Sequence, residues 1–104
     1  MGEDEACPME EFCKVVGSKW GCIIVKNLLK IDEMSFNELG RLLNTNPKTL
    51  SNKLKQLERN GLVTRRVMSD ERPIRVFYSL TNRGREARRI EEFISGWLDV
   101  WEKR

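Results

Sequence analysis

The chain has 104 residues, 39% of them hydrophobic and 34% charged, so it is long enough for one small core and too short for a two-domain enzyme. It contains no histidine, which excludes imidazole-based catalysis and most zinc sites. Its three cysteines form no C-x-x-C pair, so we expect neither a disulfide framework nor a metal site, and no cofactor.

The distribution of charge and of apolar residues suggests a partner and a compartment. No apolar stretch approaches the ~18 residues of a membrane helix, and the acidic residues 1–5 lack the features of a signal peptide. We therefore expect a cytoplasmic protein without a membrane partner. The net charge is +3, but residues 35–89 carry 13 basic and five acidic side chains, while both flanking segments are net acidic. Such a block is either a solvated face or a surface for a polyanion, and its localisation favours nucleic acid.

Periodicity and capping residues predict five helices and a hairpin. A short first helix should begin near Pro8 and end at Gly17. Ser18 can then cap a second helix, whose apolar stripe from Trp20 to Ile31 is broad. That breadth predicts a central, buried helix.

Two shorter segments follow. After a polar turn at residues 32–34, Ser35 with Glu38 three residues later predicts a capping box that opens a third helix of about two turns. Asn46 and Pro47 form an N-cap and first-turn pair for a fourth helix, which Gly61 ends as a C-terminal cap. The turn between the third and fourth helices is therefore brief.

The fourth helix, about residues 47–60, is the most informative element. On a helical wheel Leu50, Leu54 and Leu57 lie on one side. The opposite side carries cationic and amide side chains, namely Lys48, Asn52, Lys55 and Arg59. We expect one face to pack in the core and the other to remain available to a partner.

The C-terminal part combines a hairpin with a long helix. Residues 63–68 and 75–80 are rich in β-branched and aromatic residues and flank a charged turn, which predicts a hairpin. Thr81 then caps a final helix with an apolar stripe at helical spacing, formed by Ile90, Phe93, Ile94, Trp97, Leu98 and Trp101. This stripe either packs on its own domain or is covered by a second copy. Its large aromatic content favours the second copy, because so small a core does not require it.

The order of these elements is typical of a winged helix-turn-helix, so the expected fold class is mainly α with a small β-hairpin (α+β). The helix at 47–60 would enter a major groove, and the hairpin at 63–80 would form a wing on the adjacent minor groove or backbone. We expect Lys48, Thr49 and Asn52 to read bases, and Lys53, Lys55 and Arg59 to contact phosphates. Arg72 and Arg75 are the expected DNA contacts of the wing. Asn46 and Ser51 are the remaining expected DNA-binding residues. For any single residue here, a solvated surface charge is the alternative.

Several motifs together resemble the HxlR-type winged helix regulators. They are Cys7-Pro8, Val16-Gly17-Ser18-Lys19-Trp20, Phe36-Asn37-Glu38-Leu39, Asn46-Pro47-Lys48-Thr49-Leu50-Ser51, and the segments 57–63 and 78–84. The resemblance covers roughly residues 7–101. Asn46 stands where members of the family usually carry Ser or a similar residue, which exchanges one good helix cap for another.

The resemblance implies a homodimeric, DNA-binding transcriptional repressor or activator. Its dimer would be formed by the N-terminal helix, which contains Phe12, and by the C-terminal helix within 82–104. We accordingly expect residues 1–104 to form a single domain, with 1–6 flexible. A two-fold dimer would place its recognition helices ~34 Å apart on double-stranded DNA and prefer an inverted-repeat operator.

The cysteines receive separate interpretations. The resemblance makes Cys7 a candidate sensor of oxidants or electrophiles, since some members carry such a cysteine near the amino terminus. A nearby helix N-terminus favours its thiolate, whereas the acidic neighbours oppose it. We expect Cys13 and Cys22 to be small buried hydrophobic residues.

Two functions from different classes remain open at this point. The first is a dimeric, sequence-specific transcription regulator, and the second is a winged-helix module that contacts proteins without binding DNA. The basic face of the helix at 47–60 favours the first. An enzyme based on a thiol would need a second cysteine or a histidine beside the nucleophile, so we expect no catalytic residues and no enzymatic activity.

Overall fold

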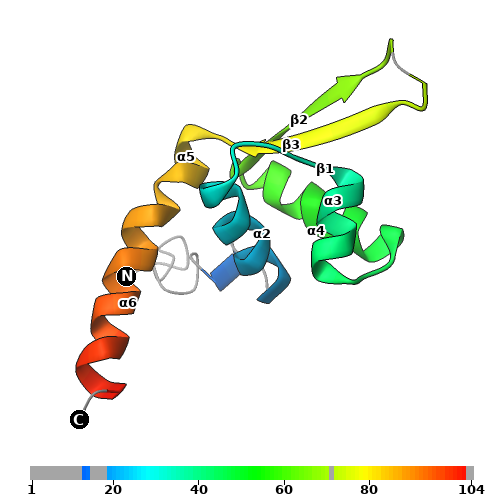
Figure 1. The fold of residues 1–104 in the computed structure, drawn as a ribbon. Coiled ribbons are helices and arrows are strands. Elements are labelled where there is room, and N and C mark those ends of the chain that lie inside the picture. Colours follow the sequence, from blue (N-terminus) through cyan, green and yellow to red (C-terminus); the bar gives the residue numbers. More distant parts are fainter. Residues whose placement is uncertain (1–12, 15–18, 71, 103–104) are drawn as a thin grey trace, which may run out of the picture.

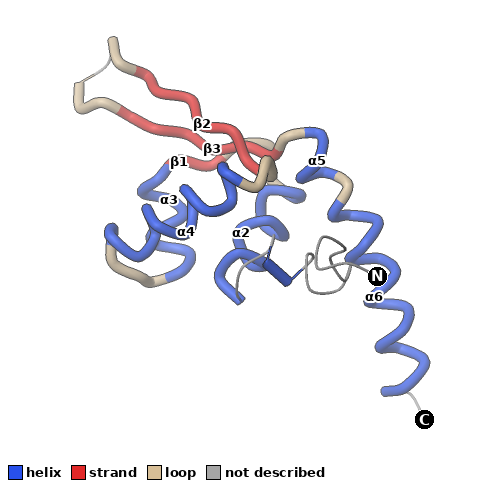
Figure 2. The backbone as a smooth tube through the Cα atoms, turned by 180° about the vertical axis from the view of Figure 1, so that it is seen from behind, coloured by secondary structure: helices blue, strands red, loops and turns tan. Residues whose placement is uncertain are grey.

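The computed structural model describes residues 13–14, 19–70 and 72–102. Its elements, in chain order, are α2 (Lys19–Lys30), β1 (Met34–Ser35), α3 (Phe36–Leu43), α4 (Pro47–Arg59), β2 (Val63–Met68), β3 (Arg75–Leu80), α5 (Asn82–Arg85) and α6 (Ala87–Glu102). Helices α2, α3 and α4 lie together on one side of a small antiparallel sheet (Figures 1 and 2). The expected fold class, mainly α with a small β component, is confirmed.

The boundaries of α3 and α4 follow from the predicted caps, whereas Ser18, the predicted cap of α2, lies outside the described residues. The Ser35 hydroxyl accepts a hydrogen bond from the Glu38 N–H at 3.1 Å, and the Glu38 carboxylate accepts one from the Ser35 N–H at 2.8 Å. At the start of α4 the Asn46 side chain accepts a bond from the Thr49 N–H at 2.8 Å. Gly61 follows α4 with a φ of +76°, in the left-handed region that favours glycine. The predicted capping box, N-cap and C-terminal glycine are confirmed.

The sheet contains one strand more than the predicted hairpin. Strands β2 and β3 have the predicted bounds, and Val63 pairs with Leu80 at the base of the hairpin. Strand β1 joins the other edge of β3, where Met34 pairs with Tyr78. The prediction of a polar turn at 32–34 was therefore wrong for Met34, which is a buried strand residue.

The core lies between the helices and the sheet, and its least exposed large side chains are Ile24, Leu39, Leu50, Leu54 and Leu57. Helix α2 buries Ile24, Val25 and Leu28, but Ile31, the last residue of the predicted stripe, follows the helix and is 51% exposed. Cys13 and Cys22 are both exposed, so the prediction that they are buried was wrong. Cys22 lies about 110° around α2 from the middle of the buried face. Because the apolar stripe in the sequence is broad, it did not distinguish Cys22 from the buried residues.

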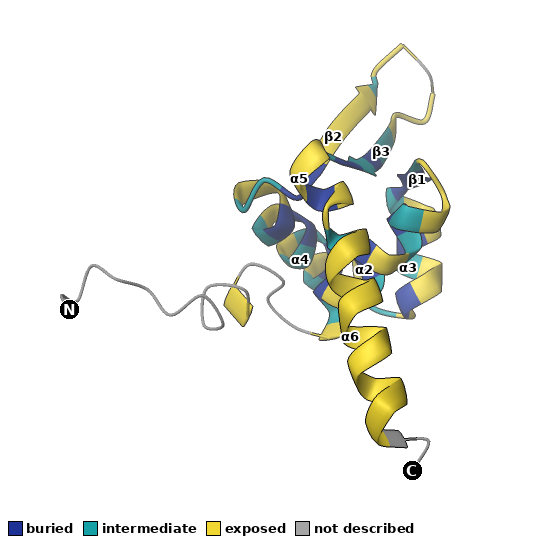
Figure 3. Cartoon of the chain, turned by 90° about the vertical axis from the view of Figure 1, so that its left-hand side faces the viewer, coloured by how far each residue is buried: buried dark blue, intermediate teal, exposed yellow. Residues whose placement is uncertain are grey.

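The C-terminal segment differs from a single continuous helix. Thr81 caps α5 as predicted, with its hydroxyl accepting from the Gly84 N–H at 3.0 Å, but the helix is interrupted at Glu86 before α6 begins. Arg88 donates to the Leu29 carbonyl at 3.0 Å and ties α6 to α2. Beyond this contact α6 projects away from the core and is exposed from 88 to 101 (Figure 3).

Candidate nucleic-acid interface

Helices α3 and α4 form a helix-turn-helix with a three-residue turn. Asn44 ends α3 in the left-handed conformation, with a φ of 51°, which asparagine tolerates better than most residues. Asn46 then caps α4, and Pro47 occupies its first turn. These residues fix the angle at which α4 leaves the turn, so the direction of α4 is set by local backbone chemistry.

The two sides of α4 are chemically opposite. Its three leucines, Leu50, Leu54 and Leu57, are each 1% exposed and anchor the helix in the core. The outer face of α4, defined as Lys48, Asn52, Lys55 and Arg59, is exposed. The remaining α4 residues in the predicted site, Thr49, Ser51 and Lys53, are half-buried on its flanks, and Asn46 is exposed at its start. The structure thus brings these predicted residues together on one helix, and no described part of the chain covers the outer face of that helix.

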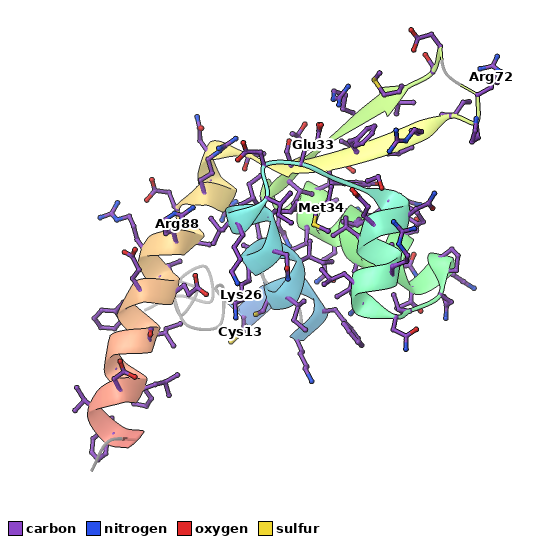
Figure 4. All side chains as sticks on the ribbon, viewed as in Figure 1. Cys13, Lys26, Glu33, Met34, Arg72 and Arg88 are labelled. Carbon is purple, nitrogen blue, oxygen red and sulfur yellow. The ribbon has the colours of Figure 1, made fainter. Side chains whose placement is uncertain are left out.

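The two predicted arginines of the wing, defined as residues 63–80, lie away from α4. Arg72 lies at the far end of the hairpin, where it donates to the Ser69 carbonyl at 3.0 Å (Figure 4). The Arg75 guanidinium lies 4.8 Å from the centre of the Phe77 ring, a cation–π contact. Side chains alternate along a strand, so Arg75 lies on the opposite side of the sheet from the core residue Tyr78. The structure places Arg72 at the tip and Arg75 on the outer side, rather than beside α4.

An ion pair connects the wing to the segment after α2. Arg66 donates to both carboxylate oxygens of Glu33, at 2.7 and 3.0 Å, and also packs on Phe77 at 4.9 Å. The hydrogen bonds from Arg66 hold the pKa of the Glu33 carboxyl below its ordinary value. Such a two-pronged contact fixes direction as well as distance, so it positions the middle of β2 in the wing.

Sequence reasoning missed Arg65, which lines a hollow between α4 and the sheet. The hollow has a volume of about 490 Å³. Its lining comprises Phe36, Ser51, Lys55, Glu58, Arg65, Val76 and Tyr78. The alternation of the predicted strand contained the necessary signal, because Val63, Arg65 and Val67 share the side that faces the core. One cation of the wing and one of the outer face of α4 therefore line the same hollow.

Some predicted residues lie outside the part that the structure describes. These are Cys7 and Phe12, together with most of the predicted first helix; only Cys13 and Lys14 of that segment are described, and both are helical. The other residues of the predicted dimer interface are exposed in α6, at between 40% for Leu98 and 76% for Phe93. The described part of one chain therefore leaves this stripe uncovered.

The described residues contain neither a candidate metal site nor a helix that could span a membrane. Across 13–14, 19–70 and 72–102, acidic and cysteine side chains form no group of three or more that could hold a metal ion. Over the same ranges, none of the helices has the length and apolar character needed to cross a membrane.

Comparisons with known proteins agree on one family. Residues 15–104 match the model of the HxlR-like helix-turn-helix family. The uncharacterized HTH-type transcriptional regulator YvaP of Bacillus subtilis (strain 168) is 36% identical over 103 residues, covering 97% of this chain and 94% of that protein.

Two solved structures share the fold. The redox regulator HypR in its reduced form has a TM-score of 0.77 and 31% identity, covering 94% of this chain and 100% of the other. The quinone-bound YodB from B. subtilis has a TM-score of 0.76 and 28% identity, covering 91% of this chain and 99% of the other. The winged helix-turn-helix expected from the order of the elements is thereby confirmed.

Proposed function

Because the chain belongs to the HxlR-like helix-turn-helix family of transcriptional regulators, we propose that it is a homodimeric regulator that binds specific DNA sequences. Helix α4 enters the major groove of an operator, and the wing contacts the adjacent minor groove or backbone. The observation that carries this proposal is the exposed outer face of α4, whose cations and amide are held outward by leucines anchored in the core.

The residues of α4 divide into two roles. Lys48, Thr49 and Asn52 are the base readers, since an asparagine amide can pair with adenine through two hydrogen bonds and a lysine can donate to guanine. Lys53, Lys55 and Arg59 are phosphate contacts, which set register and affinity without reading sequence. Asn46 and Ser51 add polar groups at the start of the helix, and Arg72 and Arg75 supply the cations of the wing.

The experiment replaces Lys48, Asn52 and Lys55 together with alanine and measures operator retention in a gel shift. We expect retention to be abolished while the helical circular dichroism is unchanged, because all three side chains are exposed. The matched control is Lys26→Ala with Lys30→Ala, which also removes two exposed cations but from α2. If the triple variant is retained like the wild type, the assignment of α4 as the recognition helix is wrong.

The dimer is proposed to form through the N-terminal helix, including Phe12, and the C-terminal helix within 82–104. The exposed stripe of α6 supports this, because seven large apolar side chains between Ile90 and Trp101 are at least 40% exposed in one chain. A contiguous apolar surface of this kind usually marks an interface. A two-fold pair of α4 helices about one duplex turn apart would then select an inverted repeat.

We also propose that Cys7 makes DNA binding responsive to oxidants or electrophiles. The likeness to the redox regulator HypR and to the quinone-bound YodB supports this proposal. Operator complexes should dissociate on addition of diamide or a quinone, and Cys7→Ser should abolish the response. Because Cys13 and Cys22 are exposed and could also react, the controls are Cys13→Ser and Cys22→Ser. If either control abolishes the response instead, Cys7 is not the sensor.

A further inference from the structure

The position of α4 and the wing determines where one DNA strand would run. A duplex has a single sugar–phosphate strand between a major groove and the minor groove next to it. With α4 in the first groove and the wing in the second, this strand must cross the space between them. That space contains the hollow lined by Ser51, Lys55 and Arg65.

We propose that the hollow is a binding site for a backbone phosphate of the operator, with Arg65 as its principal cation. The inference rests on the proposed function and adds a contact to it, since Arg65 lies outside the predicted recognition set. Arg65 approaches from β2 and Lys55 from α4, so the two cations come from the two elements that straddle the strand. Guanidinium and ammonium groups are the usual protein partners of phosphate.

The chemistry of the two neighbouring arginines supports this assignment. Arg66 is engaged by the Glu33 carboxylate through two hydrogen bonds and serves to hold the wing. Arg65, one residue earlier, points to the other side of the sheet. Within the described part of the chain, neither the Arg65 nor the Lys55 side chain makes a hydrogen bond or an ion pair. Their charges therefore remain available to an external anion.

The other residues that line the hollow include groups that favour anion binding and one that opposes it. The half-buried Phe36 and Val76 and the buried Tyr78 form an apolar floor, which reduces the local screening by water. The half-buried Ser51 offers a hydroxyl donor. Glu58 also lines the hollow and opposes an anion, so removing its charge should strengthen binding. The site thus predicts effects of opposite sign at Arg65 and Glu58.

The test measures binding of the full chain to a selected genomic fragment and to random duplex DNA over a range of salt concentrations. Arg65→Gln should weaken binding to both duplexes by a similar factor, on the order of tenfold, because phosphates carry no sequence information. It should also reduce the slope of log affinity against log salt by about 0.9 for each protomer bound. Arg65→Lys should retain most of that slope, and Glu58→Gln should tighten binding to both duplexes.

The matched control is Arg85→Gln, which removes an exposed arginine from α5, at the end of the sheet away from the wing tip (Figure 1). Its affinity and slope should equal those of the wild type. If the wild type binds DNA and Arg65→Gln binds equally well with the same slope, the phosphate site is wrong and the proposed function stands. If Arg65→Gln weakens only the selected fragment, Arg65 reads bases and the inference is overturned. If the wild type binds neither duplex, the proposed function fails, and the phosphate site with it.

Discussion

Gly84 lies where α5 packs closely against Leu62 and Leu80 at the base of the hairpin. A Cβ built there would lie 2.2 Å from the Leu62 carbonyl oxygen and 3.0 Å from the Leu80 Cδ2. The first contact is with backbone and cannot be relieved by a rotamer change. The glycine therefore allows α5 to cross the base of the hairpin.

We expect Gly84→Ala to lower the free energy of unfolding by roughly 1–3 kcal/mol, as overpacking does in other cores. Urea denaturation at one fixed protein concentration measures the change. Gly40→Ala is the control, since its Cβ would lie 3.6 Å from Leu50 Cδ2, an ordinary contact. A helical Gly-to-Ala exchange of this kind should be neutral or stabilising by up to about 1 kcal/mol. Equal stability of Gly84→Ala and the wild type would contradict the packing described.

The capping box at the start of α3 makes stability depend on pH. The hydrogen bond from the Ser35 N–H holds the pKa of the Glu38 carboxyl below its ordinary value of 4.5. A depressed pKa means that the folded state favours the carboxylate. Its contribution is therefore present above about pH 4.5 and is lost as the pH falls through the lower pKa of the folded state.

Glu38→Gln should accordingly be less stable than the wild type at pH 7, and the difference should shrink towards pH 3. Ser35→Ala should lower the free energy of unfolding by about 1 kcal/mol, the usual cost of losing an N-cap. Urea titrations between pH 7 and pH 3 measure both effects. A deficit of Glu38→Gln that is the same at every pH would show that the carboxylate charge does not stabilise the cap.

Elements whose information is local could be predicted from the sequence. The bounds of β2 and β3 follow from β-branched and aromatic runs on both sides of a charged turn, and α4 follows from Asn46, Pro47 and Gly61. Strand β1 could not be predicted, because two residues carry no periodicity and Met34 becomes a strand only by pairing with Tyr78. The interruption at Glu86 was also missed, since neither proline nor glycine marks that position.

For the candidate site, too, local features could be predicted from the sequence and tertiary contacts could not. The composition of the outer face of α4 followed from a helical wheel. The position of the wing relative to α4 depends on tertiary contacts, so the sequence did not reveal that Arg65 and Lys55 line one hollow or that Arg75 packs on Phe77.

Helix α6 offers the clearest prediction at the level of an element. Phe93 is 76% exposed in one chain, so Phe93→Glu should leave the fold of the monomer intact and prevent a second copy from covering α6. Sedimentation should then report a monomer where the wild type is a dimer. Ile74→Glu, on the wing and 56% exposed, is the matched control and should remain dimeric. A wild-type chain that sediments as a monomer at micromolar concentration would refute the dimer.

The whole molecule is more extended than a compact globule of its length. Its radius of gyration is 15.7 Å, whereas about 13 Å is typical for 100 residues. The wing and α6 contribute to this, because they project in different directions from the helical core (Figure 1). The proposed function assigns a separate macromolecule to each projection, since the wing would meet DNA and α6 would meet a second copy.

The most direct test of DNA binding follows the backbone amide resonances of the ¹⁵N-labelled chain while duplex DNA carrying a selected genomic fragment is added. The largest perturbations should fall on the first turns of α4, on Arg65 and around Arg72, with little change at the buried residues of α2. Perturbations concentrated away from α4 and the wing, or none at saturating duplex, would contradict the claim that the outer face of α4 engages DNA.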